Sequence, residues 1–158
     1  MRIRTAAVSA LACMGVVVAG TAAPVASHPA EKRPAYVKYQ RQAHNTTNNQ
    51  REARGLAEVR RTKCVQRFAV RQARTMAQQE RMFHQDLAPI LTECGLVQVG
   101  ENVAYGYPTG RSVVKDGWMK SPGHLANIVN PGYTLMGIGA RKGHDGHWYV
   151  AQVFGRKL

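Results

Sequence analysis

Carboxylate and imidazole side chains move protons and bind metals in protein sites, and both types occur in one short stretch of this chain. That stretch covers residues 100–130 and also holds a tryptophan and several turn-forming residues. Glu101 lies between a glycine and an asparagine, and His124 follows Ser-Pro-Gly, so we expect both side chains at the ends of secondary-structure elements. Such positions on a rigid scaffold commonly carry binding groups, so this stretch is the candidate functional region.

Other nucleophile and metal patterns have less support. Ser121 lies three residues before His124, but it has neither a nucleophile-elbow motif nor an evident orienting acid. His144 and His147 form an HxxH pattern, yet the Asp-Gly between them favours an exposed hairpin turn. His84, taken alone, is more typical of a hydrogen-bonded core residue than of a ligand. The separations between these histidines carry no metal signature of their own.

The first residues predict export. Arg2 and Arg4 precede a long apolar run with small residues after it, and no stop-transfer pattern follows. We assign residues 1–27 to a secretory signal peptide, with cleavage within 23–30. Cys13 lies inside the apolar run rather than at its end, which does not favour lipoprotein processing. We therefore expect a secreted protein, extracellular or associated with the cell envelope, with no transmembrane segment after cleavage.

Removal of the signal leaves two cysteines, Cys64 and Cys94. An even pair in an exported protein is typical of a disulfide, which would close a loop of about thirty residues and stabilise the fold by about 3 kcal/mol. Two free buried thiols are the alternative. A metal-binding pair has less support, because no CxxC motif or second cysteine pair accompanies them.

The chain is strongly basic. It has 22 Lys and Arg against 9 Asp and Glu, a formal charge of +13 that falls to +11 when Arg2 and Arg4 leave with the signal. This charge favours anionic partners such as lipid head groups or acidic envelope polymers, and a solvated cationic surface is the simpler alternative. Export, the even spread of the basic residues and the lack of a nucleic-acid motif exclude nucleic acid as the expected partner.

The pattern of apolar residues predicts one α+β domain with helices first and an antiparallel sheet completed by the last hairpin. Residues 28–46 are polar and contain two prolines, so we expect a flexible lead-in before a domain at 47–158. Thr46 or Thr47 is expected to cap a first helix, and Gly55 marks either the end of that helix or a close packing point.

The clearest helical periodicity lies in residues 64–84, where apolar residues recur at spacings of three and four. This pattern predicts an amphipathic helix with His84 on the inner edge of its apolar stripe and Pro89 stopping any continuation. Further elements are expected beyond it: a short strand near Glu101, a helix from Ser112 to Trp118 ended by Ser121-Pro122-Gly123, one or two helical turns at 124–129, and strands at 134–141 and 147–154. Trp118 and Trp148 are expected in the core.

Several motifs along the chain together resemble the CAP superfamily, the SCP-domain group of cysteine-rich secretory proteins, antigen 5 and pathogenesis-related proteins. The motifs are Asn48-x-x-Arg51-x-x-x-Gly55-Leu56, Phe83-His84, Gly100-Glu101-Asn102-Val103-Ala104-Tyr105-Gly106, Trp118-Met119-Lys120-Ser121-Pro122-Gly123-His124-x-x-Asn127-Ile128, Gly137-Ile138-Gly139-Ala140 and Trp148-Tyr149-Val150-Ala151-Gln152-Val153-Phe154-Gly155. The Ser-Pro-Gly-His version resembles the compact bacterial branch. The resemblance implies an α-β-α sandwich, an antiparallel sheet flanked by helices, with a cleft.

The resemblance also implies a site in that cleft, where the family often places two histidines and two acidic residues. The matching positions here are His84, Glu101 and His124, but the second acidic position holds Ser121. Asp116 lies two residues before Trp118 and should point elsewhere on its helix, so it is no substitute. Two imidazoles and a carboxylate suit a divalent ion such as zinc, and a structural polar network around Glu101 is the alternative.

The function that follows from the resemblance is a non-enzymatic, monomeric binding module for a lipid, sterol, envelope polymer or protein. The alternative is a metal-dependent hydrolase or peptidase that uses His84, Glu101 and His124. A zinc hydrolase needs a general base beside the metal-bound water, and Ser121 cannot supply one. We therefore assign no catalytic residue.

Overall fold

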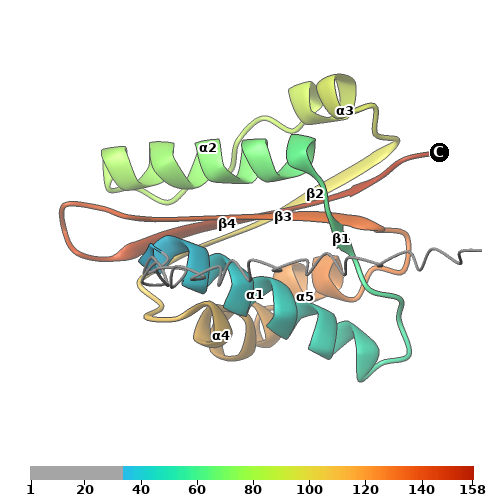
Figure 1. The fold of residues 1–158 in the computed structure, drawn as a ribbon, viewed down its shortest axis with the longest axis horizontal. Helices are drawn as coiled ribbons and strands as arrows, with labels where there is room; N and C mark the ends of the chain where they lie inside the picture. Colours follow the sequence, from blue (N-terminus) through green and yellow to red (C-terminus); the bar gives the residue numbers. More distant parts are fainter. Residues whose placement is uncertain (1–33) are drawn as a thin grey trace, which may run out of the picture. The chain divides into compact units, whose positions relative to one another are not determined.

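A four-stranded mixed sheet forms the centre of the computed structural model, which describes residues 34–158 (Figure 1). The strands are β1 (Arg60–Arg61), β2 (Gln98–Tyr105), β3 (Leu135–Lys142) and β4 (Trp148–Arg156), in the spatial order β1-β3-β4-β2. β2 and β3 both pair antiparallel with β4, as the sequence predicts. The short parallel strand β1 was not predicted, because two exposed arginines carry no strand pattern.

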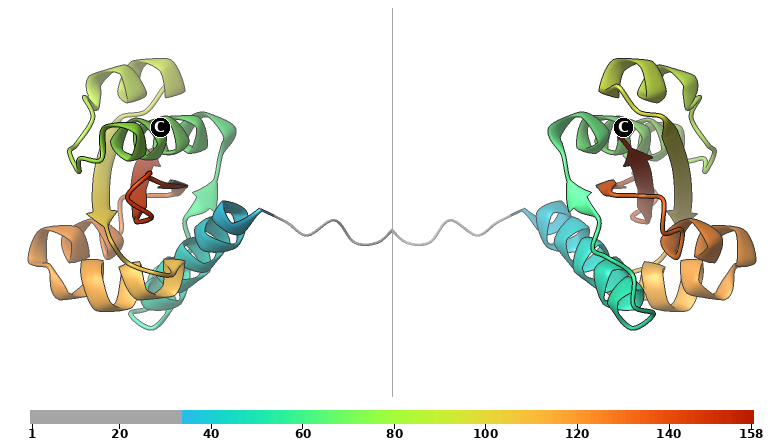
Figure 2. Two further views of the ribbon diagram at one scale, coloured as in Figure 1. Left: turned by 90° about the vertical axis from the view of Figure 1, so that its left-hand side faces the viewer. Right: turned by 90° about the vertical axis from the view of Figure 1, so that its right-hand side faces the viewer.

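Helices cover both faces of this sheet (Figures 1 and 2). One face carries α2 (Lys63–Gln79) and α3 (Ala88–Cys94). The other face carries α1 (Ala35–Glu52), α4 (Gly110–Ser112), the π-helical turn η1 (Val113–Gly117), the 3₁₀ turn η2 (Trp118–Lys120) and α5 (Pro122–Ile128). The predicted α+β fold, an α-β-α sandwich, is confirmed.

Close packing of α2 on the sheet depends on two glycines of β3. A Cβ atom on Gly137 would lie 2.6 Å from the Gln66 backbone, and one on Gly139 would overlap the carbonyl of Ala69. Buried Val65, Phe68 and Ala69 fill the interface beside them. The apolar stripe predicted for this helix therefore faces the sheet, and β3 has no side chain where the helix backbone approaches closest.

The predicted disulfide is confirmed. Cys64 near the start of α2 is bonded to Cys94 at the end of α3, with Cα atoms 5.7 Å apart. The bond joins the two helices that cover the same face of the sheet. The bond therefore fixes the end of α3, from which residues 95–97 lead into β2 and the candidate site.

The N-terminal part of the domain differs from the prediction. The first helix begins at Ala35, not at Thr46 or Thr47, so the expectation of a flexible lead-in is wrong for residues 35–46. The prediction failed because most residues of this helix are polar, so its few buried apolar residues, such as Tyr39 and Ala43, give no clear helical periodicity. Gly55 adopts a left-handed conformation just past the end of α1.

The helix predicted over residues 64–84 is shorter in the structure. The helix ends at Gln79 because Glu80 adopts a left-handed conformation (φ +48°) and donates its N–H to the carbonyl of Met76. His84 therefore lies in the loop after α2, and its predicted place on the apolar stripe is wrong. Pro89 does not end a helix but occupies the first turn of α3, where its missing N–H costs nothing.

The helical run after β2 starts at a different residue from the one predicted but ends where predicted. Thr109, not Ser112, caps α4, and the two side chains form a reciprocal capping box. The preceding helical segment ends at Lys120 with Ser121 as its C-cap, as predicted, and Pro122 then opens α5. The HxxH histidines lie exposed on either side of a turn, as predicted, with the Asp145 carboxylate accepting the N–H of His147.

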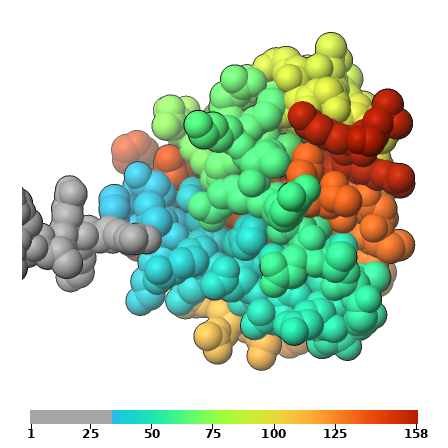
Figure 3. All heavy atoms as spheres, turned by 45° about the vertical axis from the view of Figure 1, so that its right-hand side comes forward, coloured from blue at the N-terminus to red at the C-terminus, as the bar shows by residue number. Residues whose placement is uncertain are grey.

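The predicted signal peptide and its cleavage range lie outside the described residues. None of the helices between residues 34 and 158 combines the length and apolar content needed to span a bilayer. The C-terminal end of the chain projects from the surface beside α3 (Figure 3), and Leu158 is fully exposed there.

One buried cation ties the helical layer of α1 and α5 together. Arg51 is 1% exposed and lies in the last turn of α1. Its guanidinium donates to the backbone carbonyls of Ala57, Ile128, Asn130 and Tyr133 at 2.8–3.3 Å. A planar guanidinium has enough donors for all four acceptors, which a lysine ammonium does not.

Replacement of this arginine should destabilise the fold strongly. We expect Arg51→Ala to lower the free energy of unfolding by about 3 kcal/mol or more, because it leaves buried carbonyls without a donor. The matched control is Arg54→Ala, an exposed arginine whose side chain bonds Gln50, with an expected change of about 0.5 kcal/mol or less. Urea denaturation measures both, and equal losses in the two variants would contradict this role for Arg51.

Candidate functional site: a histidine–glutamate pair beside an apolar cleft

Glu101 is a buried carboxylate in the middle of the edge strand β2. Its side chain is 1% exposed, and strand alternation turns it to the same side of the sheet as Val103. Both carboxylate oxygens accept hydrogen bonds from the loop after α2. Oε2 lies 2.9 Å from His84 Nδ1 and 3.2 Å from the backbone nitrogen of Gln85, and Oε1 lies 2.5 Å from the Gln85 side-chain nitrogen.

A hydrogen bond thus joins two of the three residues indicated by the resemblance. His84 is largely exposed, with 58% of its side chain accessible, while its partner Glu101 is buried. When Glu101 is ionised, His84 Nδ1 donates the shared hydrogen bond, because a carboxylate only accepts. The pair therefore forms a polar network of the kind expected as the alternative to a metal site.

His124 reaches the site from α5, on the other face of the sheet from α2, and is near enough to His84 for the charge of His84 to affect its titration. Its backbone carbonyl accepts a hydrogen bond from Asn102, the neighbour of Glu101 that points to the opposite side. Asn102 also bonds Gln152 of β4, and Asn127 of α5 donates to Asn102 and to the Glu101 carbonyl. This buried amide network attaches α5 to β2 and fixes where the imidazole lies.

Burial controls the titration of the site. It raises the pKa of the Glu101 carboxyl, and the hydrogen bonds from Gln85 and His84 oppose that rise. Burial, and next the charge of His84, lowers the pKa of the His124 imidazole. Both shifts favour the neutral form, so the site disfavours isolated charges.

The donor set does not fit the four-ligand metal site that the resemblance implies. No group of three or more His, Cys, Asp or Glu side chains within residues 34–158 is arranged to hold one ion. Both Glu101 oxygens are already hydrogen-bonded, and Ser121 stands at the second acidic position. We therefore derive no metal-dependent step for this site.

An apolar cleft of about 290 Å³ lies beside His124. Its lining is Met82, Val103, Ala104, Tyr105, Tyr107, Gly117, Trp118, Ser121 and His124. Trp118 is buried, as predicted, and its indole N–H donates to the carbonyl of Val103. A Cβ on Gly117 would lie 2.6 Å from the Tyr107 ring, so the glycine lets this tyrosine close one wall. Ser121 and His124 are polar groups that could meet a ligand here, beside the hydroxyls of Tyr105 and Tyr107.

Sequence analysis missed two parts of this site. Gln85 makes two hydrogen bonds to Glu101, and only its position next to His84 could have indicated that. Met82 and Tyr107 lie in loops on either side of the cleft, and no local pattern marks a loop residue as a wall of a cavity.

The layered fold and its edge-strand cleft define a class of small α-β-α sandwich domains with a site at one sheet edge. The sequence profile of the cysteine-rich secretory protein family, also called CAP, matches residues 44–154. The chain belongs to this family. The Bacillus subtilis protein YkwD is 30% identical over 108 residues, a match that covers 64% of this chain and 42% of YkwD.

Solved structures of low sequence identity share the fold. An extracellular SCP-domain protein from Bacillus anthracis has a TM-score of 0.68 at 23% identity, over 83% of this chain and 45% of that one. An outer surface protein from Borrelia burgdorferi has a TM-score of 0.66 at 16% identity, over 73% of this chain and 90% of that one. The chain thus spans less than half the length of YkwD and of the Bacillus anthracis protein.

The buried carboxyl predicts a specific pH dependence. The folded-state pKa of Glu101 is raised, so its protonated form favours folding, and that contribution is lost as pH rises from about 4.5 through the folded-state pKa. Glu101→Gln keeps an acceptor for Gln85 but cannot ionise. We expect the free energy of unfolding of wild type, relative to this variant, to fall as pH rises across that window.

Urea titrations between pH 4 and pH 8 measure the difference. Glu93→Gln removes the same charge from the exposed pair with Arg67 and controls for net charge. A wild-type minus Glu101→Gln difference that stays constant with pH would contradict the account.

Proposed function

We propose that this protein is an exported binding module that takes the apolar chain of a lipid-type amphiphile into the cleft beside His124. The observation that carries the proposal is the cleft itself: a concave, mostly apolar cavity of about 290 Å³ whose polar side chains include Ser121, His124 and the hydroxyls of Tyr105 and Tyr107. Small-molecule sites typically combine such apolar walls with a few polar groups that fix orientation.

The chemistry of the walls favours an amphiphile over a purely polar ligand. Val103, Ala104 and Trp118 would remove an alkyl chain from water, which is the main source of affinity for such a ligand. The imidazole and hydroxyl at one end could bond a head group. The lowered pKa of His124 keeps the imidazole neutral near pH 7, so it can accept or donate a hydrogen bond without a charge to desolvate.

Export is part of the proposal. The charged start and apolar run of the sequence, the disulfide between Cys64 and Cys94, and the extracellular nature of the similar Bacillus anthracis protein all support it. A sterol, a protein segment or an envelope polymer remain the other partners expected from the resemblance, and a lipid fits the lining best.

Zinc binding by His84, Glu101 and His124 stays a prediction with less support, and so does the hydrolase built on it. It would require Glu101 to give up the hydrogen bonds from Gln85 and His84. Ser121 also leaves no carboxylate to act as general base. Equilibrium dialysis with zinc, on wild type and His124→Ala, checks it.

A charge at the mouth of the cleft should weaken ligand binding. Met82 lines the cleft and is 51% exposed, so Met82→Asp leaves the core intact while it places a carboxylate against the ligand chain. We expect its affinity for 1-decanol, an uncharged probe, to fall about tenfold or more, because the new charge must be desolvated. Isothermal titration calorimetry measures the change.

The matched control is Val97→Asp. Val97 is an apolar residue with 52% exposure just before β2, outside the cleft lining. Its variant should bind 1-decanol like wild type. No wild-type binding, or an equal loss in both variants, would overturn the proposed function.

A further inference from the structure

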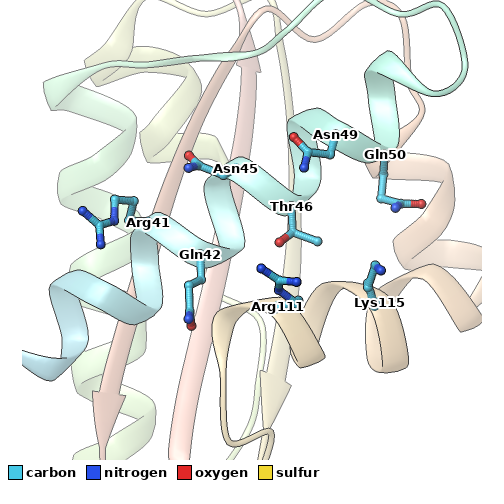
Figure 4. Close-up of a pocket in the computed structure, with 8 residues that line it drawn as sticks. All are labelled: Arg41, Gln42, Asn45, Thr46, Asn49, Gln50, Arg111 and Lys115. Carbon is cyan, nitrogen blue, oxygen red and sulfur yellow. The ribbon is translucent and has the colours of Figure 1, made fainter.

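A second cavity, of about 280 Å³, lies between α1 and the α4–η1 segment (Figure 4). It differs from the apolar cleft in its lining, which consists of cationic, amide and hydroxyl side chains. Arg111 of α4 and Lys115 of η1 point from one side toward Thr46 and Gln50 of α1 on the other, as Figure 4 shows. Arg41 of α1 is the third cation of the lining, with its guanidinium directed away from Arg111 and Lys115.

The charges of this cavity are not neutralised within the described part of the chain. Its lining has three cations and no carboxylate. Neither the side-chain hydrogen bonds nor the salt bridges formed within residues 34–158 involve Arg41, Arg111 or Lys115. Like charges four residues apart on a helical segment, as Arg111 and Lys115 are, repel each other. A bound anion would relieve that repulsion.

The types of donor indicate which anion fits. A guanidinium presents a planar set of N–H groups that matches phosphate oxygens, and an ammonium adds a compact positive charge. Thr46 and the amides of Gln42 and Asn49 can both donate and accept, which suits the hydroxyl groups of a polyol or sugar. The cavity therefore combines donors for a phosphate with partners for the alcohol it esterifies.

We propose that the cavity between α1 and α4–η1 is a binding site for a phosphate ester of a polyol or sugar. Arg111 and Lys115 bind the phosphate, and the polar side chains of α1 bind the hydroxyl groups. The ester can be a soluble molecule or one unit of a phosphate-bearing envelope polymer, since both present the same group. This site is separate from the apolar cleft, so it does not depend on the proposed function above.

Calorimetry with sn-glycerol 3-phosphate on the purified protein tests the site. We expect wild-type binding that weakens about tenfold or more in Arg111→Gln/Lys115→Gln, since charge-assisted hydrogen bonds to the phosphate are lost. The matched control is Arg156→Gln/Lys157→Gln, which removes the same charge from exposed residues at the C-terminal end (Figure 3). The control should retain wild-type affinity, and thermal melts by circular dichroism verify that both variants fold.

The outcomes distinguish specific binding in this cavity from attraction by the net positive charge of the protein. No wild-type binding of glycerol phosphate, or an equal loss in the control variant, would overturn the proposal, because the second result makes net charge the cause. If affinity depends on Arg111 and Lys115, poly(glycerol phosphate) then identifies the source. Tighter binding of the polymer than of the monomer assigns the site to an envelope polymer, and equal affinity assigns it to a soluble ester.

Discussion

The buried guanidinium of Arg51 is the constraint on which the helical layer depends. It satisfies backbone carbonyls after α1, at the end of α5 and before β3, so three stretches far apart in sequence converge on one side chain. The amide network of Asn102, Asn127 and Gln152 then attaches α5 to the sheet. These two polar clusters leave little freedom for His124, whose backbone carbonyl is itself bonded to Asn102. A binding group is most useful where its scaffold holds it in one place.

The short helical run from α4 to η2 separates two surfaces of opposite character. Gly117 and Trp118 contribute to the apolar cleft, whereas Arg111 and Lys115 line the cationic cavity against α1. The run changes from α-helical to π-helical geometry at Val113, and such irregular turns are frequent at functional sites. One segment can therefore serve an amphiphile on one side and an anionic ester on the other. A protein that works at an envelope surface would meet both kinds of group.

Much of the fold could be predicted from patterns that are local in sequence. The periodic residues of α2, the alternation of β3 and β4 and the cysteine pair each depend on neighbouring residues or on export chemistry. The start of α1 could not be predicted, because its polar face outweighs the buried Tyr39 and Ala43. The end of α2 could not be predicted either, because it depends on Glu80 in a left-handed conformation, and glutamate rarely adopts that conformation. The resemblance indicated that His84 and Glu101 share one site. That Gln85 also bonds Glu101 depends on the conformation of the loop after α2, which the sequence does not reveal.

The most direct test of the apolar cleft uses the two tryptophans of the chain as internal reporters. Trp118 lines the cleft, whereas Trp148 packs against Tyr39 outside it. In a ¹H–¹⁵N spectrum, titration with 1-decanol should shift the Trp118 indole resonance to saturation and leave that of Trp148 in place. Saturable movement of the Trp118 signal alone is the result that a ligand in the cleft predicts. An unchanged Trp118 signal, or equal drift of both signals without saturation, would contradict the account.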